Sequence, residues 1–163
     1  MPKDPKPQLA EEASPAYGAR LSGGCVYVDT SVWVALLARE AAAPALNLWL
    51  ADAPALCCAN WAELELASAL GIKHRRGELS LAAARSICDV FASMMVYQVQ
   101  QILVQAVDMT LARSLCMDMG RGLRAGDALH LAVAIRLQCS HFFSLDHNLN
   151  RNAETAGLGL VQL

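Results

Sequence analysis

The feature that most constrains the fold is a repeated alternation between short β-rich runs and longer helical runs. Strands are predicted at "CVYVD" (25–29), "ALCCA" (55–59), "VYQVQ" (96–100), "HFFSL" (141–145) and "LGLVQL" (158–163). Helical patterns cover 30–40, 43–51, 61–76, 80–93, 102–118 and 126–138, and a short helix begins at 147. Alternation of this kind predicts an α/β fold with three α/β/α layers, in which helices cover both faces of a mostly parallel central sheet.

The composition fits one compact domain. The chain has 163 residues, of which 55% are hydrophobic and 17% charged, enough to bury a substantial core. We expect residues 25–163 to form this domain and residues 1–24, with their charges and prolines, to be a disordered extension. No apolar run approaches the roughly 20 residues that a membrane-spanning helix needs, and the first residues do not resemble a secretory signal. The sequence therefore predicts a cytoplasmic protein without a membrane partner.

Six cysteines are placed mainly within apolar segments and never at a C-x-x-C spacing. In a protein that is not exported, this favours reduced, buried thiols. A zinc site formed by Cys139, His141 and His147 is the alternative, although no second ligand pair has the usual spacing. The six positions are 25, 57, 58, 88, 116 and 139.

The formal net charge of −2 does not indicate a general nucleic-acid-binding surface. Carboxylates that hold divalent metal ions nevertheless count as negative in this sum, so the charge does not exclude such a partner. Basic residues gather at 73–76 and again at Arg121 and Arg124. Each cluster is either a solvated helix end or a local contact for an anionic partner.

Three aspartates occupy positions where parallel α/β folds build their sites. Asp29 ends the first predicted strand, Asp146 follows the strand at 141–145, and Asp127 lies at the start of an apolar helix. Ligands in open α/β sheets bind beyond the carboxyl ends of the strands. We therefore expect these carboxylates to converge, although each could also serve as a turn or helix-cap residue.

A glutamate near the second strand is the fourth candidate, and two compete for the position. Glu63 and Glu65 are two residues apart in a predicted helix, so they point about 200° away from each other. Glu63 lies closer to the strand and shares a helix face with Leu66, Ala67 and Leu70, which predicts that it turns inward. The alternative role for Glu63 is a capping box with Asn60.

Four segments in this order resemble the PIN-domain ribonucleases, and among them the VapC-type toxins of bacterial toxin–antitoxin pairs. The resemblance covers about residues 25 to 162. By residue matching, it implies that Asp29, Glu63, Asp127 and Asp146 are the catalytic, metal-binding carboxylates, while Glu65 is the poorer match. The four segments are "VYVDTSVWVALL", "ANWAEL", "LRAGDALHLAVA" and "FFSLDHNL".

The resemblance implies hydrolysis of RNA to products with a 5′-phosphate and a 3′-hydroxyl. Oxygen ligands suit Mg²⁺ or Mn²⁺, which would offset the repulsion among clustered carboxylates and activate water. Thr30, Ser31 and Ser144 are nearby hydroxyls that could orient water or a phosphate, or could simply cap helices and turns. His130 is expected to pack within its helix and has no assigned role.

The resemblance also implies a homodimer and a cognate antitoxin protein, a segment of which would cross the active-site groove and could donate an arginine to the carboxylates. The alternative function is a catalytically inactive PIN-like module that binds RNA or protein. An aspartate-nucleophile phosphatase is disfavoured because Ser31 stands where a second aspartate is required. A receiver domain is disfavoured because no lysine follows Lys73.

Overall fold

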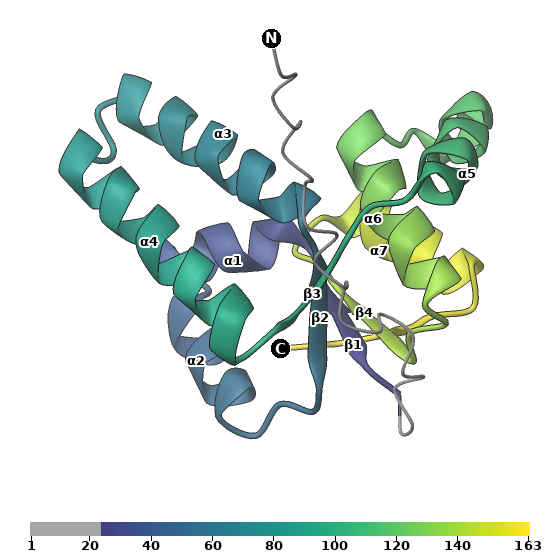
Figure 1. The fold of residues 1–163 in the computed structure, drawn as a ribbon, viewed down its shortest axis with the longest axis horizontal. Helices are drawn as coiled ribbons and strands as arrows, with labels where there is room; N and C mark the ends of the chain where they lie inside the picture. Colours follow the sequence, from purple (N-terminus) through teal and green to yellow (C-terminus); the bar gives the residue numbers. More distant parts are fainter. Residues whose placement is uncertain (1–23) are drawn as a thin grey trace, which may run out of the picture.

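A computed structural model describes residues 24–163 and contains, within that range, one five-stranded sheet (Figure 1). All its neighbouring strands are parallel, and their spatial order is β3-β2-β1-β4-β5. The predicted parallel sheet is therefore confirmed. The strands are β1 (Val26–Val28), β2 (Leu56–Ala59), β3 (Gln100–Ile102), β4 (His141–Phe143) and β5 (Gly159–Leu160). The expected disordered extension lies outside the described residues, apart from Gly24.

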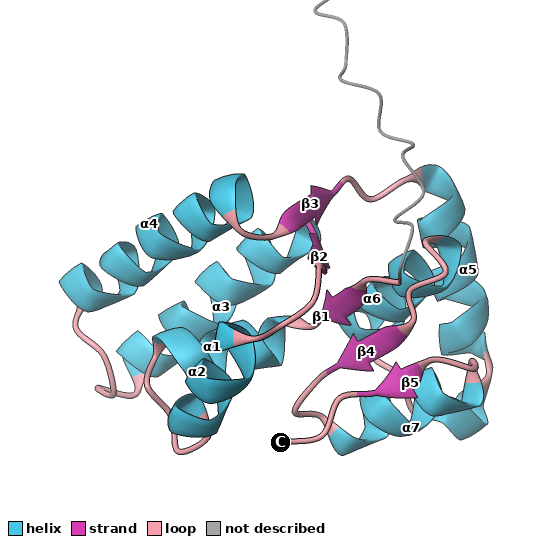
Figure 2. Ribbon diagram, turned by 90° about the horizontal axis from the view of Figure 1, so that it is seen from below, coloured by secondary structure: helices cyan, strands magenta, loops and turns pink. Residues whose placement is uncertain are grey.

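Helices cover both faces of the sheet, which confirms the three-layer α/β/α prediction (Figure 2). One face carries α1 (Thr30–Leu37), α2 (Ala43–Ala51), α3 (Trp61–Arg75) and α4 (Leu81–Tyr97). The other carries α5 (Ala106–Met117), α6 (Ala125–Arg136) and α7 (His147–Thr155), with a short 3₁₀ turn at Met119–Arg121.

The alternation of side chains along each strand divides the core into two parts. Val26 and Val28 of β1 pack with the α1–α4 layer, whereas Cys25 and Tyr27 face the layer of α6 and α7. This is the two-residue period of an extended strand buried on both faces. Because β1 is the middle strand, its two ends lie at the centre of the two sheet edges, and both edges carry unusual side-chain clusters.

Two predicted strands differ from the structure. The alternating run at 96–100 was expected to be a strand, but α4 continues to Tyr97 and β3 begins only at Gln100. The carbonyl of Met94 accepts the backbone N–H groups of Gln98 and Val99, so the helix ends inside this run. The last strand is confined to Gly159–Leu160, where it pairs with β4. Short alternating runs are ambiguous between a strand and a final helical turn.

The parallel register brings the loops after β1, β2 and β4 to one edge. Val28 of β1 pairs with Phe143 of β4, and the backbone N–H of Asp29 donates to the Phe143 carbonyl at 2.9 Å. Asp29 and Ser144 are thereby held side by side at the carboxyl ends of neighbouring strands. Among the helices of residues 24–163, none has the length and apolarity required to span a membrane.

Candidate metal centre

Asp29 is the most firmly held of the expected carboxylates. It is only 5% exposed, and its Oδ2 accepts hydrogen bonds from the Ser31 hydroxyl at 2.6 Å and the Ser144 hydroxyl at 2.8 Å. The backbone N–H of Ser31 also reaches Oδ2, at 3.3 Å, so Asp29 caps α1 as well. The other oxygen, Oδ1, lies 3.6 Å from Nε2 of His130. The hydroxyls therefore orient one carboxylate oxygen and leave the second facing the cluster.

Glu65 of α3 is the second carboxylate of this cluster. Its Oε2 accepts hydrogen bonds from the Thr30 hydroxyl at 2.7 Å and from Nε2 of His130 at 2.5 Å. Burial opposes ionisation of Glu65 and is the largest influence, but the hydrogen bond and charge of His130, aided by Thr30, lower the pKa of the carboxyl. Glu65 is thus held as a carboxylate in a partly buried position.

His130 of α6 is fully buried and contacts both carboxylates through Nε2. Burial lowers the pKa of the imidazole, but the hydrogen bond to Glu65 and the charges of Asp29, Glu65 and Asp127 outweigh it, so the pKa is raised. At Nδ1 the ring meets the Tyr27 hydroxyl at 2.7 Å, and that hydroxyl accepts the Ala59 backbone N–H at 3.2 Å. This network assigns Nε2 as a donor, because the carboxylate of Glu65 only accepts.

Asp127 and Asp146 complete the cluster from α6 and from the loop after β4. Burial raises the pKa of Asp127, and the charges of Asp29, Asp146 and Glu65 raise it further, against a hydrogen bond from the Arg124 backbone N–H. Asp146 is exposed, and its Oδ1 caps α7 by accepting the Leu149 N–H at 2.8 Å. Both aspartates therefore combine a helix-end role with a place near the other acids.

The structure does not place Glu63 with these groups, so the expectation that Glu63 turns inward is wrong. Glu63 is exposed and accepts a hydrogen bond from the side-chain amide of Gln101 on β3. The buried face of α3 is formed by Ala62, Leu66 and Leu70, and Glu65 borders this face. Leu66 and Leu70 are buried as expected, but Ala67 is exposed, so the buried face is rotated away from Glu63 and toward Ala62.

Gly126 explains how Glu65 fits against α6. A Cβ atom at this glycine would collide with Oε1 of Glu65 and would lie 3.4 Å from Nε1 of Trp61. The glycine immediately before Asp127 therefore lets the glutamate approach the helix backbone. The indole N–H of Trp61 is itself buried and has no hydrogen-bond partner among the described residues.

Three groups of the cluster were not assigned to the site from the sequence: Glu65, which was set aside in favour of Glu63, His130, which was given no role, and Tyr27. A signal for His130 was available, because it follows Asp127 by three residues and thus shares its helix face. Gly126 was a signal for a close approach of another segment. Tyr27 carried no such signal, since an aromatic residue in a buried strand is ordinarily a core residue.

Other expected ligands are placed elsewhere. Within residues 24–163, the side chains close enough to share an ion form two groups: Asp29 with Glu65 and His130, and Cys25 with Cys57 and Cys139. The alternative zinc site formed by Cys139, His141 and His147 is therefore not assembled. The six cysteines are free, as expected, although Cys88 and Cys116 are only half-buried.

Part of each basic cluster is paired with neighbouring acids. Lys73 pairs with Glu40 at 2.7 Å and Glu78 at 3.1 Å, while Arg121 pairs with Asp118 at 2.9 Å. These contacts favour the interpretation of both clusters as solvated helix ends. Exposed pairs of this kind contribute little to stability.

Comparison with known proteins identifies the family. The model of the PIN domain family matches residues 26–155, and the chain therefore belongs to this family, as the four segments indicated. No curated protein sequence gives a significant match.

Solved structures share the fold at low sequence identity. VapC20 of Mycobacterium tuberculosis, a toxin that cleaves the sarcin-ricin loop, superimposes with a TM-score of 0.65 and 22% identity, over 85% of this chain and 99% of that one. The protein PAE2754 of Pyrobaculum aerophilum superimposes with a TM-score of 0.62 and 20% identity, over 91% of this chain and 93% of that one. VapBC2 of Rickettsia felis, solved with a promoter DNA fragment, superimposes with a TM-score of 0.57 and 13% identity, over 84% of this chain and 97% of that one.

Proposed function

We propose that the protein is a metal-dependent endoribonuclease that hydrolyses RNA phosphodiester bonds and acts as the toxin of a VapBC-type pair. The observation that supports this proposal is the meeting of Asp29, Glu65 and His130 at the carboxyl edge of the sheet. Asp127 and Asp146 lie nearby, because burial and then the charges of Asp29, Asp146 and Glu65 raise the pKa of Asp127. Membership of the PIN family and the likeness to VapC20 support it.

The donor chemistry fits a hard divalent cation. The converging groups are carboxylate oxygens, which Mg²⁺ and Mn²⁺ prefer, and clustered carboxylates repel one another until a cation offsets their charge. Asp29 and Glu65 would hold the ion, and Asp127 and, at the exposed rim, Asp146 would add negative charge around it. Bound Mg²⁺ or Mn²⁺ would supply charge stabilisation and activation of water. His130 is placed to offset part of the negative charge and to fix Glu65.

The surrounding hydroxyls serve the site by positioning its ligands. Ser31 and Ser144 hold Asp29 in one orientation, and Thr30 holds Glu65. All three therefore act as positioning residues rather than as contacts to substrate. In the overall reaction, water adds to phosphorus and the bond to the 3′-oxygen breaks. That oxygen takes a proton, leaving a 3′-hydroxyl and a 5′-phosphate.

The decisive experiment is cleavage of a structured RNA by the purified chain in Mg²⁺ or Mn²⁺, with and without EDTA. We expect cleavage that EDTA abolishes and that the readdition of metal restores. The products should accept ligation at a 5′-phosphate. Cleavage that continues at full rate in EDTA would overturn the metal mechanism, and binding of RNA without cleavage in every metal would favour the inactive module.

An antitoxin is the proposed protein partner. A groove of about 650 Å³ runs between the start of α3 and helices α5 and α6, and Trp61, Leu64 and Met109 are among its apolar lining residues. Leu64 and Met109 are more than half exposed, which is typical of a surface that binds a partner. The groove adjoins the acidic cluster through Trp61, so a bound segment could reach the carboxylates.

The homodimer implied by the resemblance also remains a proposal. Large apolar side chains are exposed beyond the groove, including Leu48 at 77%, Val96 at 72% and Tyr97 at 82%. Light scattering at tens of micromolar should show a dimer, and a strict monomer would contradict it.

A further inference from the structure

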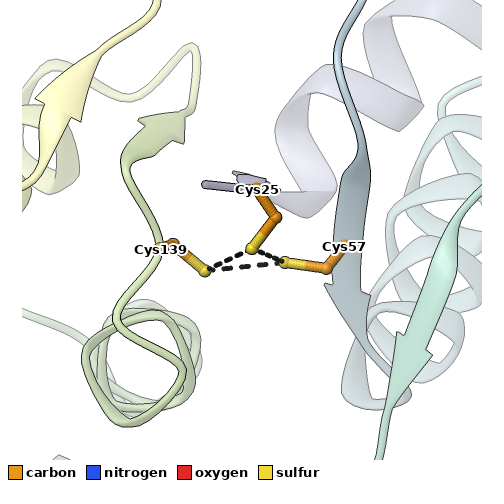
Figure 3. A group of neighbouring side chains, drawn as sticks. All are labelled: Cys25, Cys57 and Cys139. Atoms are coloured by element: carbon orange, nitrogen blue, oxygen red, sulfur yellow. Dashed lines mark hydrogen bonds between the residues drawn. The ribbon is translucent and has the colours of Figure 1, made fainter. Parts of the chain in front are cut away.

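A second cluster lies at the opposite edge of the sheet and is made of sulfur. Cys25 directly precedes β1, Cys57 is the second residue of β2, and Cys139 lies in the connection from α6 to β4. Figure 3 shows the three side chains pointing toward one another from these three segments. The sulfur–sulfur distances are 3.2 Å for Cys25 and Cys139, 3.3 Å for Cys25 and Cys57, and 3.6 Å for Cys57 and Cys139.

The backbone fixes this arrangement. Cys25 and Cys57 both face the layer of α6 and α7, and the pairing of Val26 with Leu56 sets their relative position. The carbonyl of Cys25 accepts the backbone N–H and the hydroxyl of Ser140, at 3.0 and 3.1 Å, which holds Cys139 beside it. All three cysteines are at most 5% exposed. The three sulfurs are therefore preorganised before any ligand arrives.

The spacing indicates a shared ligand rather than a single disulfide. A disulfide joins two sulfurs at about 2.05 Å and leaves a third unpaired, whereas here the three separations are nearly equal. An ion about 2.3 Å from each sulfur, the usual zinc–thiolate length, would lie about 1.2 Å from the plane of the three atoms. That position leaves the ion a fourth coordination direction away from the sulfurs.

We propose that Cys25, Cys57 and Cys139 form a site for one thiophilic metal ion, Zn²⁺ or Cu⁺. Thiolates select these soft or borderline ions over Mg²⁺ and Mn²⁺. Among the described residues, the three sulfurs are the complete set of converging donors at this position. The bound cation offsets part of the thiolate charge, which would be costly in these apolar surroundings, and Zn²⁺ offsets more of it than Cu⁺ does.

The ion would join the amino-terminal ends of the three central strands. Cys57 belongs to β2, Cys25 adjoins β1 and Cys139 precedes β4, and these strands are neighbours in the order β2-β1-β4. Tyr27 follows Cys25 on the same strand face and contacts His130 of the acidic cluster. The site is therefore a structural cross-link beneath the proposed nuclease centre and distinct from it.

The test is metal titration of the full chain after complete reduction under anaerobic conditions. Cd²⁺, a spectroscopic substitute for Zn²⁺, should give thiolate-to-metal charge-transfer absorption that saturates at one equivalent per chain. Zn²⁺ and Cu⁺, each bound first in separate samples, should shift the Cd²⁺ titration to higher Cd²⁺ concentrations, and the larger shift identifies the ion that the site prefers. Excess Mg²⁺ should leave the band unchanged.

The variants Cys25→Ser and Cys139→Ala should each weaken Cd²⁺ binding by more than about 100-fold. The matched control is Cys88→Ser, because Cys88 is a half-buried thiol on α4 outside the cluster, and this variant should bind like the parent chain. Circular dichroism checks that each variant is folded. If a variant does not fold, the titration of the unaltered chain still tests the proposal.

Two results would overturn the proposal. One is the absence of stoichiometric charge-transfer absorption in the reduced parent chain. The other is a band that survives both Cys25→Ser and Cys139→Ala. If mass spectrometry shows that two of the three thiols form a disulfide and the reduced protein binds no ion, the cluster is a redox pair instead.

Discussion

The two edges of the sheet are built from the same strands but carry opposite donor chemistry. At the carboxyl edge, Asp29 and its neighbours present oxygen atoms, and Asp146 remains open to solvent. At the amino edge, Cys25 and its partners present sulfur in a closed, apolar position. An oxygen site with one side open to solvent suits a hard ion that must also meet a substrate, whereas a closed sulfur site suits a structural ion. One strand, β1, therefore carries both donor clusters, one at each of its ends.

Asp29→Asn should have the largest effect and tests most directly whether the two clusters are independent. It keeps the size of the side chain and removes the charge at the best-held position of the acidic cluster, so RNA cleavage in Mn²⁺ should fall by about 100-fold or more. The Cd²⁺ charge-transfer band of the cysteines should stay unchanged. Loss of both properties in a folded variant would show that the two edges are not independent.

Glu65→Gln should reduce cleavage by about 10- to 100-fold, because the amide is a poorer partner for a hard cation and for His130. The matched control is Glu63→Gln, which changes the same residue type two positions away on the exposed side of α3 and should leave the cleavage rate unchanged. Initial rates under identical metal concentrations give the comparison. A larger loss of cleavage rate in Glu63→Gln than in Glu65→Gln would show that α3 presents its other face to the site.

Gly126→Ala should lower cleavage by about tenfold, since the new Cβ forces the Glu65 carboxylate to move and small displacements of catalytic groups are costly. Gly120→Ala is the control, because the nearest atom to its Cβ would be Asp118 Oδ1 at an ordinary 3.5 Å. A rate equal to that of the control would mean that Glu65 does not need its observed position.

Tyr27→Phe should have the smallest effect on cleavage and a clear effect on stability. The substitution leaves the buried Ala59 N–H and Nδ1 of His130 without their common partner, which should lower the free energy of unfolding by about 1–3 kcal/mol. Denaturant unfolding measures it, with the exposed Tyr97→Phe as the control. Equal free energies of unfolding for the two variants would show that the hydrogen bonds of the Tyr27 hydroxyl do not stabilise the protein.

The sequence alone determined the fold class and the positions of two aspartates, Asp29 and Asp146. Strand-and-helix alternation has a strong periodic signal, and each of these residues follows a strand, whereas Asp127 lies in a helix that follows α5 and the 3₁₀ turn and is placed by the packing of α6. A residue at the carboxyl end of a parallel strand must lie at the sheet edge whatever the details of packing. These positions could therefore be predicted without knowing how the helices are rotated.

Only the tertiary structure decided between Glu63 and Glu65, because that choice depends on the rotation of α3 about its axis. Two residues correspond to about 200° of rotation. The sequence interpretation took Ala67 as buried, but Ala67 is exposed, so the apolar pattern did not fix the rotation of α3 about its axis. The contacts of His130 and of the three cysteines were also decided only by the tertiary structure. Cys25 meets Cys57 across 32 residues and Cys139 across 114, and such contacts arise from strand order and register, which no local pattern encodes.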